Sequence, residues 1–129
     1  MADVTIRHIT ASAGREIKAS THYAYVQNGI TLDGSKFATG ELVLEGQCLV
    51  MDNASGLYEK YADNAGNFPA GKSNPCILDE SVKFVVDDGG NNPNVTAGQV
   101  LVHGAVYKGM LKGYTTAFGT ALAGAIRLV

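Results

Sequence analysis

The chain has no tryptophan, three prolines and two cysteines, and it lacks an excess of charge of either sign. Ten basic and twelve acidic residues give a net charge of −2, and neither sign gathers into a long block. This balance excludes the basic footprint of a nucleic-acid-binding protein. Cys48 and Cys76 form no C-x-x-C pair, so we expect reduced, half-buried thiols, although spacing alone does not exclude a disulfide.

Long hydrophobic runs and grouped metal ligands are also missing. No apolar run approaches the roughly 18 residues of a membrane-spanning helix. The start, MADVTIRHIT, lacks the basic and apolar parts of a secretory signal, so we expect a soluble protein made in a cytoplasm, without a membrane partner. His8, His22 and His103 have no histidine three or four residues away, so we expect neither a metal site nor a cofactor.

Glycine, in contrast, is abundant, with sixteen residues in a chain of 129. Before residue 110, no sustained 3.6-residue apolar repeat is present. Short β-rich runs alternate with turn residues instead. The sequence therefore predicts a mainly β fold with one short C-terminal helix, divided into an N-terminal arm and linker over 1–20 and a single β-rich domain over 21–129.

The expected elements follow from these runs. Asn28-Gly29 predicts a hairpin between its two flanking strands. The arm strand over 4–9 precedes a small-residue connector over 10–20, and loops are expected over 63–75 and 88–94. The predicted strands span 4–9, 22–27, 30–34, 41–52 with a kink at Gly46, 57–62, 76–78, 82–87, 98–107 and 125–129, and the helix lies within 110–125.

The stretch GNFPAGKS (66–73) matches the phosphate-loop pattern G-x-x-x-x-G-K-[ST]. A phosphate loop needs a helix after it and then a parallel strand, a crossover of a dozen or more residues. Only eight residues separate Ser73 from Val82, and Pro75 is one of them. We therefore interpret the stretch as a loop without a nucleotide.

Other reactive side chains also have simple structural interpretations. The pairs Asp79-Glu80 and Asp87-Asp88 stand at strand ends, where we expect solvated turns, and 87–94 lacks the spacing of a calcium loop. His103 shares a strand face with Tyr107 and is expected in a hydrogen-bonded core or at an interface. No nucleophile is linked to it, so the sequence indicates no enzyme.

Three segments resemble the head decoration proteins of lambda-type phages. They are FATGELVLEGQCLVMDNASGLYEKYA (37–62), NPCILDESVKF (74–84) and VLVHGAVYKGML (101–112), and the ending TTAFGTALAGAIRLV (115–129) is similar to that family's close. The similarity covers roughly residues 37–129. Residues 1–36 depart from the pattern, since they are long and rich in predicted strands, and the hairpin HYAYVQNGITLDG (22–34) has no counterpart in it. The resemblance implies a small β-barrel or β-tulip-like domain.

The resemblance also implies a function. It points to a non-enzymatic virion structural protein that forms a homotrimer on the outer surface of a mature phage capsid and stabilises the major capsid protein shell. The arm would add a strand to an open sheet edge of that partner. The expected capsid-binding residues are Val4, Ile6, His8 and Ile9. The expected trimer-interface residues are His103, Tyr107, Phe118 and Leu122.

Two alternatives stay open at this level. The arm strand over 4–9 can instead be an edge strand of its own domain. The chain can also be another phage structural or adhesion module, such as a head fibre, a tail component or a host-glycan binder, because its six tyrosines suit stacking on sugars as well as strand packing.

Overall fold

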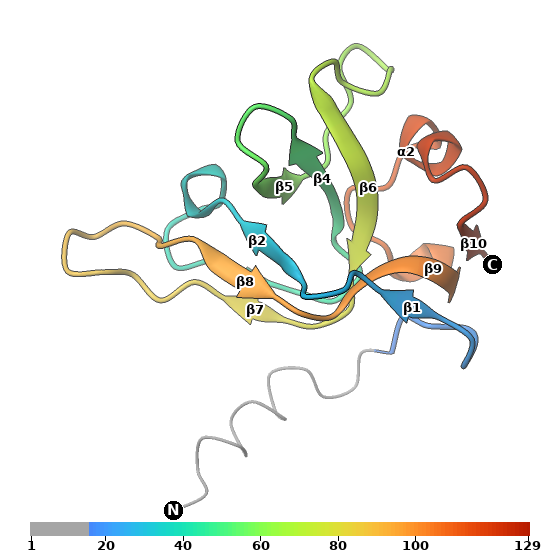
Figure 1. Ribbon diagram of the computed structural model, residues 1–129, viewed down its shortest axis with the longest axis horizontal. Helices are drawn as coiled ribbons and strands as arrows, with labels where there is room; N and C mark the ends of the chain where they lie inside the picture. The colour runs from blue at the N-terminus through green and yellow to red at the C-terminus, as the bar shows by residue number, and fades with distance from the viewer. Residues whose placement is uncertain (1–15) are drawn as a thin grey trace, which may run out of the picture.

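The computed structural model describes residues 16–129 and is mainly β, with one short α-helix, as the sequence predicts (Figure 1). The predicted arm strand over 4–9 lies outside the described residues. The strands and helices, in chain order, are β1 (Ala24–Tyr25), β2 (Ile30–Leu32), η1 (Gly34–Lys36), β3 (Leu42–Val43), β4 (Cys48–Asp52), β5 (Tyr58–Lys60), β6 (Lys72–Leu78), β7 (Val82–Lys83), β8 (Val95–Ala97), β9 (Val100–Val106), η2 (Lys108–Met110), α2 (Thr116–Ala121) and β10 (Ile126–Leu128).

One curled sheet contains most of the strands. Its order is β1-β9-β6-β4-β5-β2-β8, with β10 pairing in parallel to β9, while β3 and β7 form a separate two-stranded sheet. The first and last strands of this order are β1 and β8. In the chain, β1 is followed by β2, the pairing partner of β8, and β8 is followed by β9, the pairing partner of β1. The sheet therefore curls into a half-barrel.

The central strands are buried on both faces, and alternate side chains enter two different hydrophobic cores. On β4, Leu49 belongs to the first core and Val50 to the second; on β9, Val100 and Leu101 divide in the same way. The first core is closed by β3 and β7. The second is closed by α2 and β10. This division explains why these strands read as continuous apolar runs in the sequence.

The expected local hairpin at Asn28-Gly29 is wrong. The turn itself forms, with φ of 67° and 74° at the two residues. However, β1 pairs with β9, and β2 pairs with β8 and β5. The two strands beside the turn therefore lie along the consecutive strands β9 and β8 and do not pair with each other. Tertiary pairing has overridden the local turn preference.

Several strand boundaries also differ from the prediction. The strand expected over 76–78 begins at Lys72, so the GKS letters lie at the start of β6 and not in the loop expected over 63–75. β7 covers only Val82–Lys83 of the expected 82–87. β8 was not predicted, because its three residues follow a run of turn residues. The Gly46 kink, the β4–β5 return, α2 and β10 are confirmed.

The linker expected over 10–20 differs from the structure where it is described. Ile17 is fully buried in the second core, and Lys18 forms a β-bridge with Val106. The backbone N–H of Ala19 donates to the carbonyl of Ala105. Residues 16–19 are therefore part of the folded domain, because a single isoleucine among small residues gives no periodic signal to read.

Both thiols are free, as predicted, but they are fully rather than half buried. Cys48 faces the second core and Cys76 the first, from neighbouring strands of the same sheet. Side chains on opposite faces of a sheet point apart, which opposes a disulfide between them. Burial raises the pKa of Cys48 to about 12 and also raises that of Cys76, so neither is a reactive thiolate.

Candidate interaction surface

A broad open hollow of about 540 Å³ lies where β9, β10 and the segment before β1 meet. We call it the histidine hollow. Within residues 16–129, its lining contains two imidazoles, one guanidinium, one phenol and small side chains, and no acidic residue. The six residues that define it are Ser20, His22, His103, Tyr107, Arg127 and Val129.

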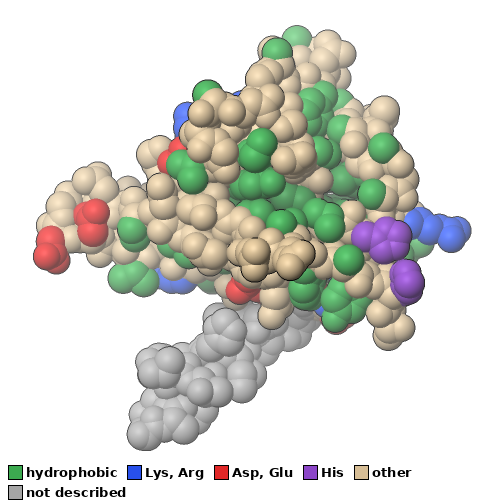
Figure 2. All heavy atoms as spheres, in the orientation of Figure 1, with side chains coloured by type: hydrophobic (Ala, Val, Ile, Leu, Met, Phe, Trp, Pro, Cys, Tyr) green, Lys and Arg blue, Asp and Glu red, His purple; other side chains and the backbone are tan. Residues whose placement is uncertain are grey.

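The two histidines of this hollow contact each other. Their ring centroids lie 5.4 Å apart, with an interplanar angle of 77°, in an edge-to-face arrangement. β1 brings them together because Ala24 pairs with His103, which places His22 beside the same strand. Figure 2 shows both histidines at the surface, at one end of the long axis.

Gly104 permits this close approach. Its φ is 141°, and a Cβ built on it would lie 2.9 Å from the Cβ of Tyr23 and 3.4 Å from the carbonyl oxygen of His22. A larger residue would push the segment before β1 away from β9 and separate the histidine pair. The glycine after His103 therefore shapes the hollow directly.

The rim combines apolar and cationic groups, all exposed. Tyr107 is 48% and Val129 56% exposed, and Arg127, which lines the same hollow, is also exposed. A second, smaller hollow of about 400 Å³ shares Tyr107 and adds Tyr23. Exposed aromatic and arginine side chains are enriched at protein interfaces, so the surface has the composition of a binding face.

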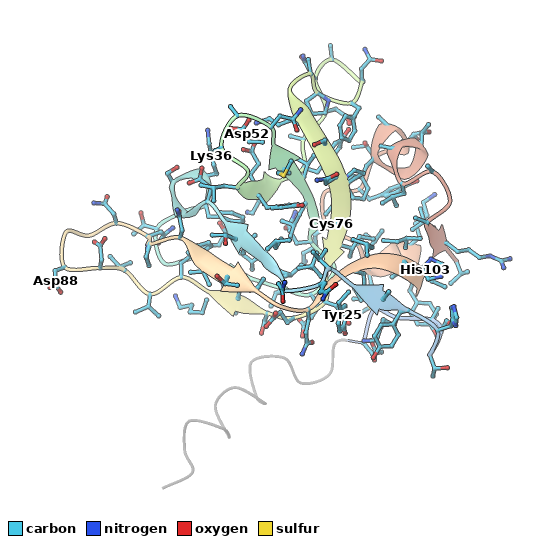
Figure 3. The ribbon with its side chains drawn as sticks, viewed as in Figure 1. Tyr25, Lys36, Asp52, Cys76, Asp88 and His103 are labelled. Carbon is cyan, nitrogen blue, oxygen red and sulfur yellow. The ribbon has the colours of Figure 1, made fainter. Side chains whose placement is uncertain are left out.

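A polar cluster around the buried Asp79 adjoins the smaller hollow, which Lys18 helps to line. The Asp79 side chain is 3% exposed, and its Oδ2 accepts from Lys18 Nζ and from the Tyr25 hydroxyl, both at 2.6 Å. Glu16 is a second partner of Lys18, at 3.1 Å, but is largely exposed. Figure 3 labels Tyr25 and His103, which lie on the paired strands β1 and β9.

The pKa shifts follow from these contacts. Burial alone would lower the pKa of Lys18, but its hydrogen bonds and ion pairs with Asp79 and Glu16 outweigh burial and raise the pKa above 10.5. Burial and the Asp79 carboxylate raise the pKa of Tyr25. Lys18 is thus held charged and Tyr25 held neutral, which suits a structural link between the segment before β1 and the end of β6.

The expectation of a solvated turn at Asp79-Glu80 is therefore wrong for Asp79. Glu80 is also engaged, since its Oε2 accepts from the N–H groups of Gly98 and Gln99, each at 2.9 Å. The partners of Asp79 are more than fifty residues away in the chain, so only the fold brings them to it.

The Asp87-Asp88 turn is confirmed. Asp87 Oδ1 accepts from the N–H groups of Gly89 and Asn91, and both aspartates are exposed. Among residues 16–129, no group of three or more histidine, cysteine or acidic residues is placed to hold a metal ion. The same part of the chain contains no helix long and apolar enough to cross a membrane.

The four predicted trimer-interface residues separate into two pairs. His103 and Tyr107 are exposed in the histidine hollow. Phe118 and Leu122 are buried in the second core at 0% and 5% exposure, which argues against a contact of either side chain with a partner. Because His103 is exposed, the expected core position is wrong, and the expected interface position stays a prediction.

The predicted capsid-binding residues Val4, Ile6, His8 and Ile9 lie outside the described residues. The phosphate-loop pattern has no helix after it: Lys72 starts an antiparallel strand and forms ion pairs with Glu59 at 3.3 Å and Asp52 at 3.8 Å. This geometry agrees with the interpretation that the pattern holds no nucleotide.

Sequence reasoning missed Arg127, Lys18 and Tyr25. Arg127 stands on a short final strand whose alternation with Ile126 and Leu128 marks it as outward-facing, a signal that was available. Lys18 and Tyr25 gave no such signal, because their role depends on Asp79.

Comparison with known proteins adds no relative to this description: no protein-family model, no curated protein and no solved structure matches the chain.

Proposed function

We propose that the protein is a non-enzymatic structural component of a phage virion, a homotrimer that binds the outer surface of the mature capsid and stabilises it. The observation that carries the proposal is the histidine hollow, an exposed surface with interface composition at the place where the sequence predicted a subunit contact. His103 and Tyr107, both predicted for that contact, lie together in it. The resemblance of residues 37–129 to head decoration proteins supports the same function.

The internal construction of the domain also suits this role. The buried Asp79 carboxylate is occupied by Lys18 and Tyr25 and holds the segment before β1 to the end of β6. The two histidine rings contact each other in an open hollow at the surface. A small domain of this kind gains binding strength from many symmetric copies on one shell, through avidity.

Capsid binding through Val4, Ile6, His8 and Ile9 stays a prediction. Ile17 and Lys18 hold the chain to β9 shortly after that segment, so a partner bound by the arm would be tied to a folded anchor. The major capsid protein is the proposed partner, and the virion surface the proposed location. A strand added to an open edge of the capsid protein would supply main-chain hydrogen bonds.

Binding to shells tests the proposal directly. The purified protein should sediment as a trimer, bind expanded but not unexpanded phage shells, and raise the temperature at which the shells break. Deletion of residues 2–12 should weaken shell binding while the unfolding midpoint of the domain stays nearly unchanged. A full-length protein that is monomeric and binds no shell would refute the proposal.

A second function has one specific observation in its favour. Tyr23 and Tyr107 are 41% and 48% exposed and line the same small hollow, an arrangement that suits stacking on a sugar ring. A host-glycan-binding module would show tyrosine fluorescence changes with host polysaccharide and no effect on shells. The shell and polysaccharide assays therefore separate the two functions.

A further inference from the structure

The molecule carries an acidic projection at the end opposite the histidine hollow. The loop between β7 and β8 extends away from the body, and Asp88 stands at its tip (Figures 1 and 3). Figure 2 shows acidic side chains at this end and the histidines at the other. We call residues 85–91 the acidic tip.

The acidic tip is internally ordered. The Asp87 N–H donates to the Asn91 carbonyl at 2.9 Å, and the Asp87 carboxylate accepts two backbone N–H groups. At the base of the loop, Asn92 donates to the carbonyls of Gly34, Phe37 and Ala38. A loop held in one conformation loses little entropy when it binds.

The surface of the tip complements the hollow in two ways. Val85 and Val86 are 73% and 39% exposed, next to the carboxylates of Asp87 and Asp88. The hollow offers the matching groups: exposed Tyr107 and Val129 for the valines, and Arg127 with two imidazole N–H donors for the carboxylates. Among the described residues that line the hollow, none is acidic and would repel the carboxylates of the tip.

We propose that the acidic tip of one copy docks into the histidine hollow of the next, so that the homotrimer is a closed head-to-tail ring. The number of subunits, three, is taken from the proposed function, and to that extent the inference rests on it. Two different surfaces at opposite ends of one chain make a heterologous contact, which closes into a ring when the rotation permits. Arg127 and Asp88 are the central charged pair of this contact.

Charge reversal tests the pair. Arg127→Glu and Asp88→Lys should each weaken self-association by at least about tenfold, the scale of close interfacial charge pairs, and the double variant should recover most of the loss. Lys36→Glu is the matched control, because it reverses an exposed charge in η1, and Figure 3 shows Lys36 apart from both Asp88 and His103. Sedimentation equilibrium measures the association constants, and loss without recovery in the double variant would count against direct pairing.

Cross-linking tests the head-to-tail arrangement. Asp88→Cys combined with Arg127→Cys should give covalent trimers under mild oxidation, whereas each single variant should give none. Cys48 and Cys76 do not compete, because both are buried. Cross-linking of the Arg127→Cys variant alone would mean that two hollows face each other and would overturn the proposal.

The two proposals fail separately. If the protein trimerises and binds shells but all charge reversals and cysteine pairs leave the trimer unaffected, the head-to-tail contact is wrong and the proposed function stands. If the ring forms through Asp88 and Arg127 but no shell is bound, the contact stands and the proposed function is wrong.

Discussion

The Asp79 cluster and the histidine hollow both depend on residues 16–25, yet they treat polar groups in opposite ways. Lys18 and Tyr25 donate hydrogen bonds to the carboxylate of Asp79, whose side chain is 3% exposed. His22, from the same segment, remains exposed, with the ring of His103 as its neighbour. One cluster is satisfied inside the molecule, and the other keeps its hydrogen-bonding groups available at the surface.

Within this one stretch of chain, the residues of the Asp79 cluster serve stability, whereas the exposed residues of the histidine hollow are available for binding. Buried polar groups are costly to leave unpaired, so each member of the Asp79 cluster depends on the others. Exposed groups can be changed with little cost to the fold, because water replaces the lost partner. Substitutions in the Asp79 cluster should therefore lower the free energy of unfolding, whereas substitutions in the histidine hollow should weaken binding and leave stability nearly unchanged.

Lys18→Met should have the largest effect on stability. It leaves the Asp79 carboxylate buried without its cation, and removal of one partner of a buried pair costs about 3 kcal/mol in the free energy of unfolding. Urea denaturation measures the loss, with Lys36→Met as the exposed control. A loss below about 1 kcal/mol, the value of exposed ion pairs, would show that the cluster is effectively solvated.

Tyr25→Phe should have the next largest effect. It removes only the hydroxyl that donates to Asp79 Oδ2, and a hydrogen bond to a charged group is worth about 2 kcal/mol. Tyr107→Phe is the matched control, since the Tyr107 side chain is exposed. Equal melting temperatures for the two variants would contradict the assigned role of Tyr25.

The contribution of Lys18 should depend on pH in one direction only. Because its pKa is higher in the folded than in the unfolded chain, the stabilisation is fully present below the unfolded value near 10.5 and is lost as pH rises through the folded value. The stability gap between wild type and Lys18→Met should thus stay constant from pH 7 to about 9.5 and narrow above it. Urea midpoints across that range provide the test, and a gap that narrows below pH 9 would contradict the assignment.

His103→Ala should have the smallest effect on stability, within about 0.5 kcal/mol, because the side chain is exposed. Its self-association should nevertheless weaken, since the imidazole faces the proposed contact. Parallel urea and sedimentation measurements show whether the two properties separate. Destabilisation comparable to that of Lys18→Met would place His103 with the structural residues instead.

The fold class was accessible from the sequence because glycine and turn residues punctuate short β-rich runs. The β4–β5 return, α2 and β10 were also predicted, since each has a local signal: a turn, a change of period, or an apolar alternation. The exposed positions of His103 and Tyr107 were only partly predicted. The pattern identified their strand, but not the segment before β1 that completes the hollow.

Sequence alone thus determined the mainly β class, the short C-terminal helix, the lack of a phosphate loop at residues 66–73 and the turn at Asp87. Tertiary structure alone decided that β1 and β2 diverge to different partners, that Asp79 is buried with Lys18 and Tyr25, and that two histidines far apart in the chain meet. The physical reason is range: turns and side-chain periodicity act over a few residues, whereas strand pairing and the satisfaction of a buried charge depend on groups more than fifty residues away.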